Sequence, residues 1–201
     1  MNFGTKTMRN QEASPYASKR DFCQIFEKNM SPLYLLSFLL TGDEATAEQC
    51  FVGGLHIAQE GNLVFKDWAE RWARRTIILN AIRMIRPRLP SESITVPESG
   101  RAVHPAIEHP EISAIVGLPS FERFGFVMSV LEGYQDHECA LHLNCTVSEV
   151  REARARALEK MGKSAELQGK LVTIASHRGT PQENSESGFP FETASRLAVP
   201  A

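Results

Sequence analysis

The stretch between residues 118 and 161 constrains the fold more than any other part of this sequence. Apolar side chains recur there at steps of three and four residues, which is the period of one face of an α-helix. Ser120 can cap such a helix after Pro119, and Gly133 can end it. The stretch therefore begins with a predicted helix whose inward residues are Phe121, Phe124, Met128 and Leu131.

Two further helices are predicted after this one, joined by a tight turn. Asp136 can cap a short helix, and Asn144 tolerates the left-handed conformation that a sharp turn needs. Thr146 can cap the helix that follows. A short helix, a turn of three to four residues and a second helix form a DNA-binding helix-turn-helix. The inward residues of the second helix are Val147, Val150, Ala157 and Met161.

This pattern resembles region four of the sigma-70 family of transcription initiation factors, particularly the small extracytoplasmic-function type. The matching residues are Leu118, Pro119, Arg123, Phe126, Leu131, Glu132, Gly133, Glu138, Ala140, Leu143, Thr146, Val150, Arg156 and Ala157. The resemblance implies that the helix over 146–160 reads an upstream promoter element in the major groove. The residues expected to contact DNA there are Thr146, Ser148, Glu149, Arg151, Glu152, Arg154, Arg156 and Lys160.

The N-terminal half also has helical periodicity. Residues 1–19 are polar and lack it, so they are predicted to form a flexible arm. After them, helices are predicted from about 20, from Ser31-Pro32 to Thr41, over 44–59 and over 65–86. The third of these contains Gly53-Gly54, which costs roughly 1 kcal/mol per glycine relative to alanine.

Charge divides this half into two surfaces. Residues 21–60 carry six acidic side chains against one lysine, whereas 66–88 carry seven basic side chains against two acidic ones. The first surface suits a basic partner and the second a phosphate backbone. Trp68 and Trp72 lie among the arginines and can stack on unpaired bases. Solvated helix surfaces, with the two tryptophans in the core, are the alternative interpretation.

This half resembles region two of the same family. The matching residues are Leu33, Tyr34, Leu40, Thr41, Gly42, Asp43, Ala47, Glu48, Phe65, Trp68, Arg71, Ala73, Arg74 and Ile78. The resemblance implies that an acidic helix docks on core RNA polymerase through Asp43, Glu44, Glu48 and Phe51. It also implies contacts with an opened downstream promoter element from Trp68, Arg71, Trp72, Arg74, Arg75, Asn80 and Arg83.

The predicted fold is all-α, with two small helical domains joined by a proline-rich linker. The expected segments are the arm at 1–19, a region 2-like domain at 20–86, a linker at 87–117, a region 4-like domain at 118–161 and a tail at 162–201. Five prolines in the linker disfavour helix there. The tail is expected to contain a short helix from Ser164 to about Ser176, followed by disorder.

Several classes of function are disfavoured by the sequence. No phosphate-binding loop, nucleophile elbow or paired histidine and carboxylate signature is present, so neither an enzyme nor a catalytic residue is expected. Neither a cofactor nor a metal site is expected, because Cys139, His142 and Cys145 occupy predicted core positions and His137 points elsewhere. We expect a cytoplasmic protein, since the sequence has neither a signal peptide nor a membrane span.

The predicted function is that of a transcription initiation factor that binds core RNA polymerase and directs it to promoter DNA. An anti-sigma factor is a further partner that the family implies. Two alternatives stay open at this point. One is a degenerate sigma-like interaction protein, because the family's acidic string is replaced by Gln49–Gly54. The other is an ordinary helix-turn-helix transcriptional regulator whose first half is an unrelated ligand or dimer domain.

Overall fold

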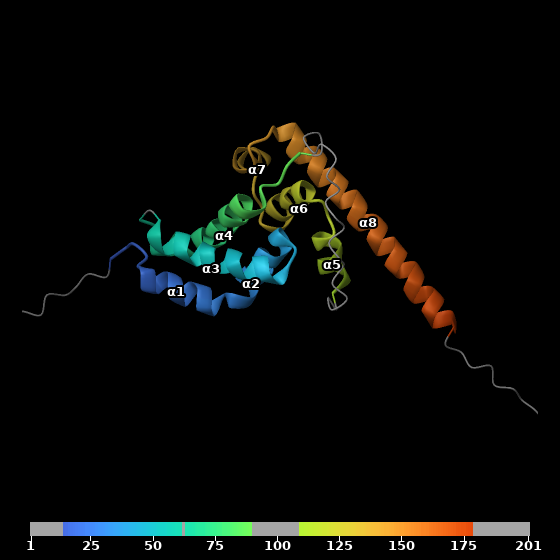
Figure 1. Ribbon diagram of the computed structural model, residues 1–201, viewed down its shortest axis with the longest axis horizontal. Coiled ribbons are helices and arrows are strands. Elements are labelled where there is room, and N and C mark those ends of the chain that lie inside the picture. The colour runs from blue at the N-terminus through green and yellow to red at the C-terminus, as the bar shows by residue number, and fades with distance from the viewer. Residues whose placement is uncertain (1–13, 62, 90–108, 179–201) are drawn as a thin grey trace, which may run out of the picture. The chain divides into compact units, whose positions relative to one another are not determined.

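The fold is all-α, as predicted. The computed structural model describes residues 14–61, 63–89 and 109–178 (Figure 1). Within these ranges most residues are helical, and the one pairing of extended segments is an isolated antiparallel bridge between Tyr16 and Phe65. The chain divides into a compact unit that ends at Ala165 and a second unit that begins at Glu166.

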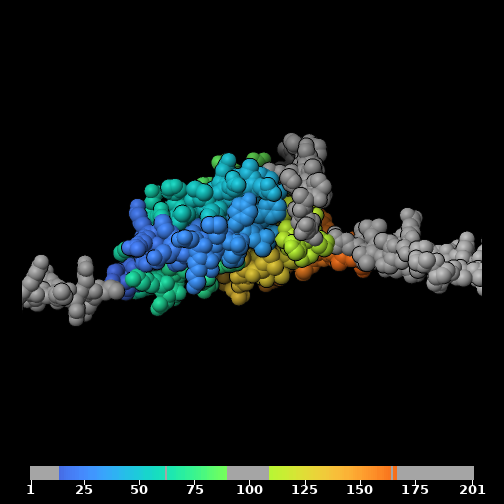
Figure 2. All heavy atoms as spheres, turned by 90° about the horizontal axis from the view of Figure 1, so that it is seen from below, coloured from blue at the N-terminus to red at the C-terminus, as the bar shows by residue number. Residues whose placement is uncertain are grey.

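Four helices form the N-terminal half. They are α1 (Lys19–Lys28), α2 (Met30–Thr41), α3 (Glu44–Glu60) and α4 (Ala69–Ile85), with a 3-10 turn, η1 (Lys66–Trp68), before the last. Helices α3 and α4 lie side by side in Figure 1, and α2 packs against both. Figure 2 shows α1 and α2 along one face of the unit. The predicted helices at 31–41, 44–59 and 65–86 are therefore confirmed to within a few residues.

The glycine pair in α3 allows that helix to pack closely against α4. A side-chain carbon at Gly53 would lie 2.4 Å from Nδ2 of Asn80, and one at Gly54 would lie 2.8 Å from Cγ1 of Ile77. Both distances are shorter than side-chain carbons tolerate, so the two helices could not approach this closely with alanine at either position. Close packing with α4 therefore offsets the helix propensity that the two glycines lose.

The prediction of a flexible arm is wrong for the part of it that the structure describes. Backbone hydrogen bonds pair the segment before α1 with the segment before η1, from Ala17 N to Val64 O at 2.7 Å and from Lys66 N to Pro15 O at 2.9 Å. Ser18 then caps α1 and exchanges hydrogen bonds with Asp21, as a capping box does. The rest of the predicted arm, residues 1–13, lies outside the described residues.

The C-terminal half contains the predicted helix-turn-helix. Its elements are α5 (Pro110–Val116), α6 (Ser120–Phe126), a π-helical turn η3 (Val127–Leu131), α7 (Asp136–Leu143) and α8 (Val147–Arg178). Asn144 ends α7 at φ 53° and ψ 51°, the left-handed conformation expected of it. Thr146 caps α8 by accepting a hydrogen bond from Glu149 N, while Glu149 accepts one from Thr146 N in return.

Three details of this half differ from the prediction. The N-cap of α7 is Gln135 and not Asp136, which occupies the first helical position, and Pro119 is the N-cap of α6 in place of Ser120. The predicted linker contains α5, because proline fits the first turn of a helix. The prediction of a separate helix in the tail is also wrong, because α8 continues without a break to Arg178. Residues 90–108 and 179–201 lie outside the described residues.

The two halves share one hydrophobic core. Its buried residues run from Phe22 in α1 to Ala157 in α8. At the centre of the contact is Arg123, a buried arginine of α6 with only 6% of its surface exposed. It donates hydrogen bonds to the carbonyl oxygens of Leu40 and Thr41 at 3.2 and 3.3 Å, and to those of Val116 and Leu118 at 2.9 and 3.2 Å. The predicted division into two domains is therefore not confirmed.

We predict that Arg123→Ala lowers the free energy of unfolding by about 3 kcal/mol or more, because it removes a buried charge and leaves four carbonyl groups without their donor. Arg123→Lys should lose less, since it keeps the charge but cannot span all four oxygens. Urea unfolding followed by both tryptophan fluorescence and circular dichroism measures this. Arg20→Ala, an exposed arginine of α1, is the control and should change stability by no more than about 0.5 kcal/mol. Unchanged stability of Arg123→Ala would refute the role given to this residue.

Candidate nucleic-acid interface

The first turns of α8 present two arginines that share one carboxylate. Arg151 Nε lies 2.8 Å from Asp136 Oδ2, and Arg154 Nη1 lies 2.5 Å from Asp136 Oδ1. These hydrogen bonds, from Arg151 first and Arg154 second, hold the pKa of Asp136 below its ordinary value. The Arg151 side chain is 65% exposed and that of Arg154 is 32% exposed. Arg151 is therefore the more accessible of the two, and Asp136 fixes the direction of both guanidinium groups.

The next two cations of α8 point back toward α6. Arg156 Nε lies 3.0 Å from one carboxylate oxygen of Glu122, and Lys160 Nζ lies 2.6 Å from the other. The Glu122 side chain is only 4% exposed, so these two bonds compensate a carboxylate that is otherwise removed from water. Arg156 and Lys160 were predicted to contact DNA. In this structure their first role is to neutralise Glu122.

The remaining predicted contacts in α8 are polar groups of its exposed surface. Thr146 and Glu149 form the helix cap described above, and this cap lowers the pKa of Glu149. Ser148 and Glu152 are exposed and lie on one side of the helix, with Ser148 Oγ 3.4 Å from Glu152 Oε1. The predicted upstream surface thus has one well exposed arginine at its centre.

Helix α4 carries the predicted downstream surface. Arg71 and Arg83 are exposed and Arg75 is half-buried, and within the described ranges none of the three forms an ion pair. Arg74 instead forms a bidentate pair with Glu132, which follows η3, through its Nε (2.7 Å) and Nη2 atoms. This carboxylate is only 8% exposed, so breaking its ion pair with Arg74 would leave a nearly buried charge without a partner. The ion pair therefore fixes Arg74 at the contact between the two halves. The free positive charge of the surface therefore comes from the other three arginines.

Exposed aromatic rings lie at the N-terminal end of α4. Trp68 is 65% exposed and packs edge-on against Phe65, with ring centroids 5.8 Å apart. Phe65 in turn stacks on Tyr16 at 4.8 Å. We call these three rings the aromatic ladder. Leu63, which is 78% exposed, lies beside them in the chain. Sequence reasoning missed Tyr16, because it lies in a polar segment and reaches the ladder only through the bridge to Phe65.

Two residues predicted to contact DNA are less accessible than predicted. Asn80 is 7% exposed and donates a hydrogen bond from Nδ2 to Cys50 O at 3.0 Å, which joins α4 to α3. Such an amide cannot meet a base unless the core opens, so Asn80 does not belong to the surface. Trp72 is half-buried, and its indole nitrogen is buried without a hydrogen-bond partner in the described part of the chain. Trp68, and not Trp72, is the accessible tryptophan.

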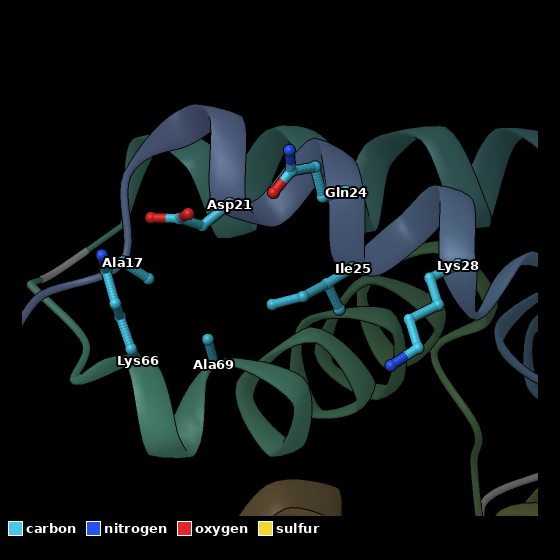
Figure 3. Close-up of a pocket in the computed structure, with 7 residues that line it drawn as sticks. All are labelled: Ala17, Asp21, Gln24, Ile25, Lys28, Lys66 and Ala69. Atoms are coloured by element: carbon cyan, nitrogen blue, oxygen red, sulfur yellow. The ribbon is translucent and has the colours of Figure 1, made fainter.

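A shallow pocket of about 290 Å³ lies between α1 and the beginning of α4 (Figure 3). Ala17, Ile25 and Ala69 give it an apolar floor, and Lys28 and Lys66 lie at opposite ends. Asp21 lies toward the Lys66 end, where the Ser18 backbone and side chain, and to a lesser degree Lys66, lower its pKa. Lys66 follows Phe65 of the aromatic ladder in the chain and also lines this pocket. The positive charge of Lys66 therefore lies between the ladder and α1.

The predicted polymerase-binding residues lie at the beginning of α3. Glu44 and Glu48 are exposed, whereas Asp43 caps the helix by accepting a hydrogen bond from Thr46 N at 2.9 Å. Phe51 is half-buried and packs edge-on against Phe26 and Tyr34. Burial raises the pKa of Tyr34, and the charges of Glu48, Glu44 and Asp43 add to the effect.

The cysteines and histidines that the sequence brings together form no joint site. All four cysteines are free thiols, and burial raises the pKa of Cys50 and of Cys139 to about 11. His137 is exposed, whereas Cys139 is buried. Among the described residues no group of three or more metal-ligating side chains is close enough to hold a metal ion. In the same ranges no helix has the length and apolar character needed to cross a membrane.

Comparisons with known proteins add no assignment. No protein-family model matches the chain, and no curated protein matches it either.

We predict that Asp136→Asn lowers thermal stability at pH 7 and that this difference disappears in acid. Because the folded-state pKa of Asp136 is below its ordinary value of 3.8, its contribution is complete above that value and is lost as the pH falls through the lowered pKa. Melting temperatures of both proteins from pH 7 to about pH 2 measure this. Asp67→Asn, an exposed carboxylate without an ion pair in the described ranges, is the control. A difference that persists in acid would contradict the prediction.

Proposed function

We propose that this protein is a sigma-like transcription initiation factor that binds core RNA polymerase and promoter DNA. The observation that carries the proposal is the helix-turn-helix, with a left-handed Asn144 in the turn, a Thr146 cap and Arg151 exposed one turn into α8. The sequence resemblance to regions two and four of the sigma-70 family supports the same function. No catalytic step is part of the proposal.

Base reading at the upstream element would rest on Arg151. An arginine early in a recognition helix can donate two hydrogen bonds to O6 and N7 of guanine. Asp136 acts as a positioning residue, because its two oxygens hold Arg151 and Arg154 in fixed directions before DNA arrives. A preset direction reduces the conformational entropy that the arginine loses on binding. The shared carboxylate therefore favours base discrimination at some cost in net positive charge.

Contact with the downstream element would rest on the aromatic ladder. Bases that leave the duplex can stack on exposed aromatic side chains, each contributing about 1–3 kcal/mol without strong sequence preference. Trp68 offers the most exposed ring, and Phe65 and Tyr16 support it from behind. Arg71 and Lys66, both exposed beside the ladder, would contact the phosphates of the same strand. This combination fits an unpaired strand better than a closed duplex.

Docking on core polymerase would use Glu44 and Glu48. Both are exposed on the first turns of α3, so a basic partner surface can approach them without any change in the fold. Val52, which is 53% exposed further along α3, adds an apolar contact. The need for a large partner also follows from charge, because Arg74, Arg156 and Lys160 are paired internally. In α8 both Arg156 and Lys160 are paired with Glu122, so the helix-turn-helix should bind DNA weakly without polymerase.

An interaction protein without promoter activity is the second candidate. The internal pairing of Arg74, Arg156 and Lys160 favours it, because these positions serve the fold whether or not DNA binds. Run-off transcription with purified core polymerase separates the two candidates. Sequence-dependent transcripts support the initiation factor, and polymerase binding without transcripts supports the interaction protein.

We predict that Arg151→Ala weakens discrimination at one or two upstream base pairs by about 1–3 kcal/mol, because a bidentate arginine contact is worth that much. Run-off transcription from promoters with single-base changes measures the effect. Lys163→Ala is the matched control, since Lys163 is a cation of the same helix and its one ion pair among the described residues is with Glu159. If Arg151→Ala keeps the full sequence preference of the wild-type protein, then the proposed mode of base reading is wrong.

We predict that Glu48→Lys abolishes co-purification with core polymerase while thermal stability stays nearly unchanged. Losing one carboxylate of a desolvated interfacial ion pair costs roughly 2–5 kcal/mol, and a lysine adds repulsion. Stability should hold because Glu48 is exposed and forms no ion pair within the described ranges.

Glu60→Lys reverses the same charge at the far end of α3 and should leave co-purification intact. A Glu48→Lys protein that binds polymerase as well as the wild type would move the interface elsewhere. Wild-type protein that fails to bind polymerase even at low salt would refute the proposed function.

A further inference from the structure

A second cavity, of about 280 Å³, lies where the end of α4 meets α6 and α7. Apolar side chains from both halves of the unit line part of it, with Ile82, Pro87 and Leu89 on one side and Phe121 and Leu143 on the other. Phe121 and Leu143 are buried core residues, so the cavity reaches down to the hydrophobic core. The functional surfaces described above do not include this cavity.

Three basic side chains line the same cavity. Arg86 and Arg88 come from the segment that follows α4, and His142 comes from α7. Both arginines are exposed, and within the described residues neither forms an ion pair or a side-chain hydrogen bond. No carboxylate is among the described residues that line the cavity. The site thus differs from the arginines beside Asp136, Glu122 and Glu132, where a carboxylate neutralises the charge.

The backbone around the cavity is unusual as well. Arg86 and Asn144 both line it, and in the described ranges they are the two residues other than glycine with positive φ, at 50° and 53°. Asparagine tolerates this conformation, but arginine is rarely chosen for it, and glycine is the usual residue at the end of a helix. Unfavourable backbone conformations tend to persist where a side chain has a function. A glycine would be the simpler residue at 86 if no side chain were needed there.

We propose that this cavity binds the phosphate group of a small phosphorylated molecule. Arg86 and Arg88 would donate charge-assisted hydrogen bonds to the phosphate oxygens, since guanidinium groups match that geometry. His142 would add one N–H donor from its half-buried imidazole, and the apolar part of the lining would contact a flat group such as a nucleobase. The volume, slightly below the usual range for ligand pockets, suits a mononucleotide or a smaller phosphate and not a nucleic-acid duplex.

Calorimetric titration of the full-length protein with adenosine monophosphate, and separately with inorganic phosphate, tests the proposal. Saturable binding of either ligand is expected, and tighter binding of the nucleotide would show that the apolar part of the lining contributes. Arg86→Gly should weaken binding at least about tenfold, which corresponds to about 1.4 kcal/mol. Arg88→Gln should weaken it to a similar degree.

Arg86→Gly also separates loss of binding from loss of folding. Its melting temperature should equal or exceed that of the wild-type protein, because glycine accepts the left-handed conformation without strain. Arg20→Gln removes one exposed arginine from α1 and should bind as the wild type does.

The proposal is overturned if neither ligand binds, or if Arg86→Gly and Arg88→Gln both bind as tightly as Arg20→Gln. It is also overturned if a short DNA duplex displaces the nucleotide competitively, because the cations would then belong to a DNA surface. None of these outcomes depends on whether the protein binds polymerase.

Discussion

The arrangement of this protein depends on Arg123, the buried arginine that satisfies the ends of two helices at once. Helices α2 and α5 end with carbonyl groups that have no partner within the helix, and the carboxyl end of a helix carries partial negative charge. Two of the accepting carbonyls belong to the last residues of α2, Leu40 and Thr41, and a third belongs to Val116 at the end of α5. Gly42 allows the guanidinium to come this close, since a side-chain carbon there would lie 3.1 Å from Nη1 and the backbone has φ 83°. One side chain of α6 therefore couples the N-terminal helices to the helix-turn-helix.

Several charged side chains of this protein form internal ion pairs that stabilise the fold, and these are therefore not available to a partner. Glu122 and Glu132 are nearly buried carboxylates, and together they engage Arg74, Arg156 and Lys160. A buried carboxylate without its partners would cost several kcal/mol, so these three cations cannot move to a phosphate without leaving an expensive group behind. Among the described residues, Arg71, Arg83 and Arg151 form no ion pair with a buried carboxylate. Counting basic residues in the sequence overestimates the positive charge available to DNA for this reason.

Sequence patterns predicted the positions of the helices well. They did not predict which side chains are buried or form ion pairs. Periodicity and cap residues located α2, α3, α7 and the beginning of α8, because both signals are local. The pairing of Arg74 with Glu132, 58 positions apart, and the burial of Asn80 against α3 are tertiary contacts, which no local signal encodes. Gly53-Gly54 lowers helix propensity in any sequence window, yet its purpose, the close approach of α4, is visible only in three dimensions. Composition likewise assigned all of 87–117 to a linker, although Pro110 begins a helix.

Under the proposed function, the contact between the halves decides which side chains can meet DNA first. The bidentate pair of Arg74 with Glu132 joins α4 to the segment between η3 and α7, so a phosphate that takes Arg74 must leave a carboxylate that is 8% exposed without its partner. Trp68, Arg71 and Arg151 need no such exchange, because all three are already exposed. Arg74 can therefore join a DNA contact only if the surroundings of Glu132 open to water, whether by movement of the halves or by a partner that covers the carboxylate. A polymerase surface that supplied a cation to Glu132 would make that exchange favourable, which gives the proposed partner a physical role beyond holding the protein near DNA.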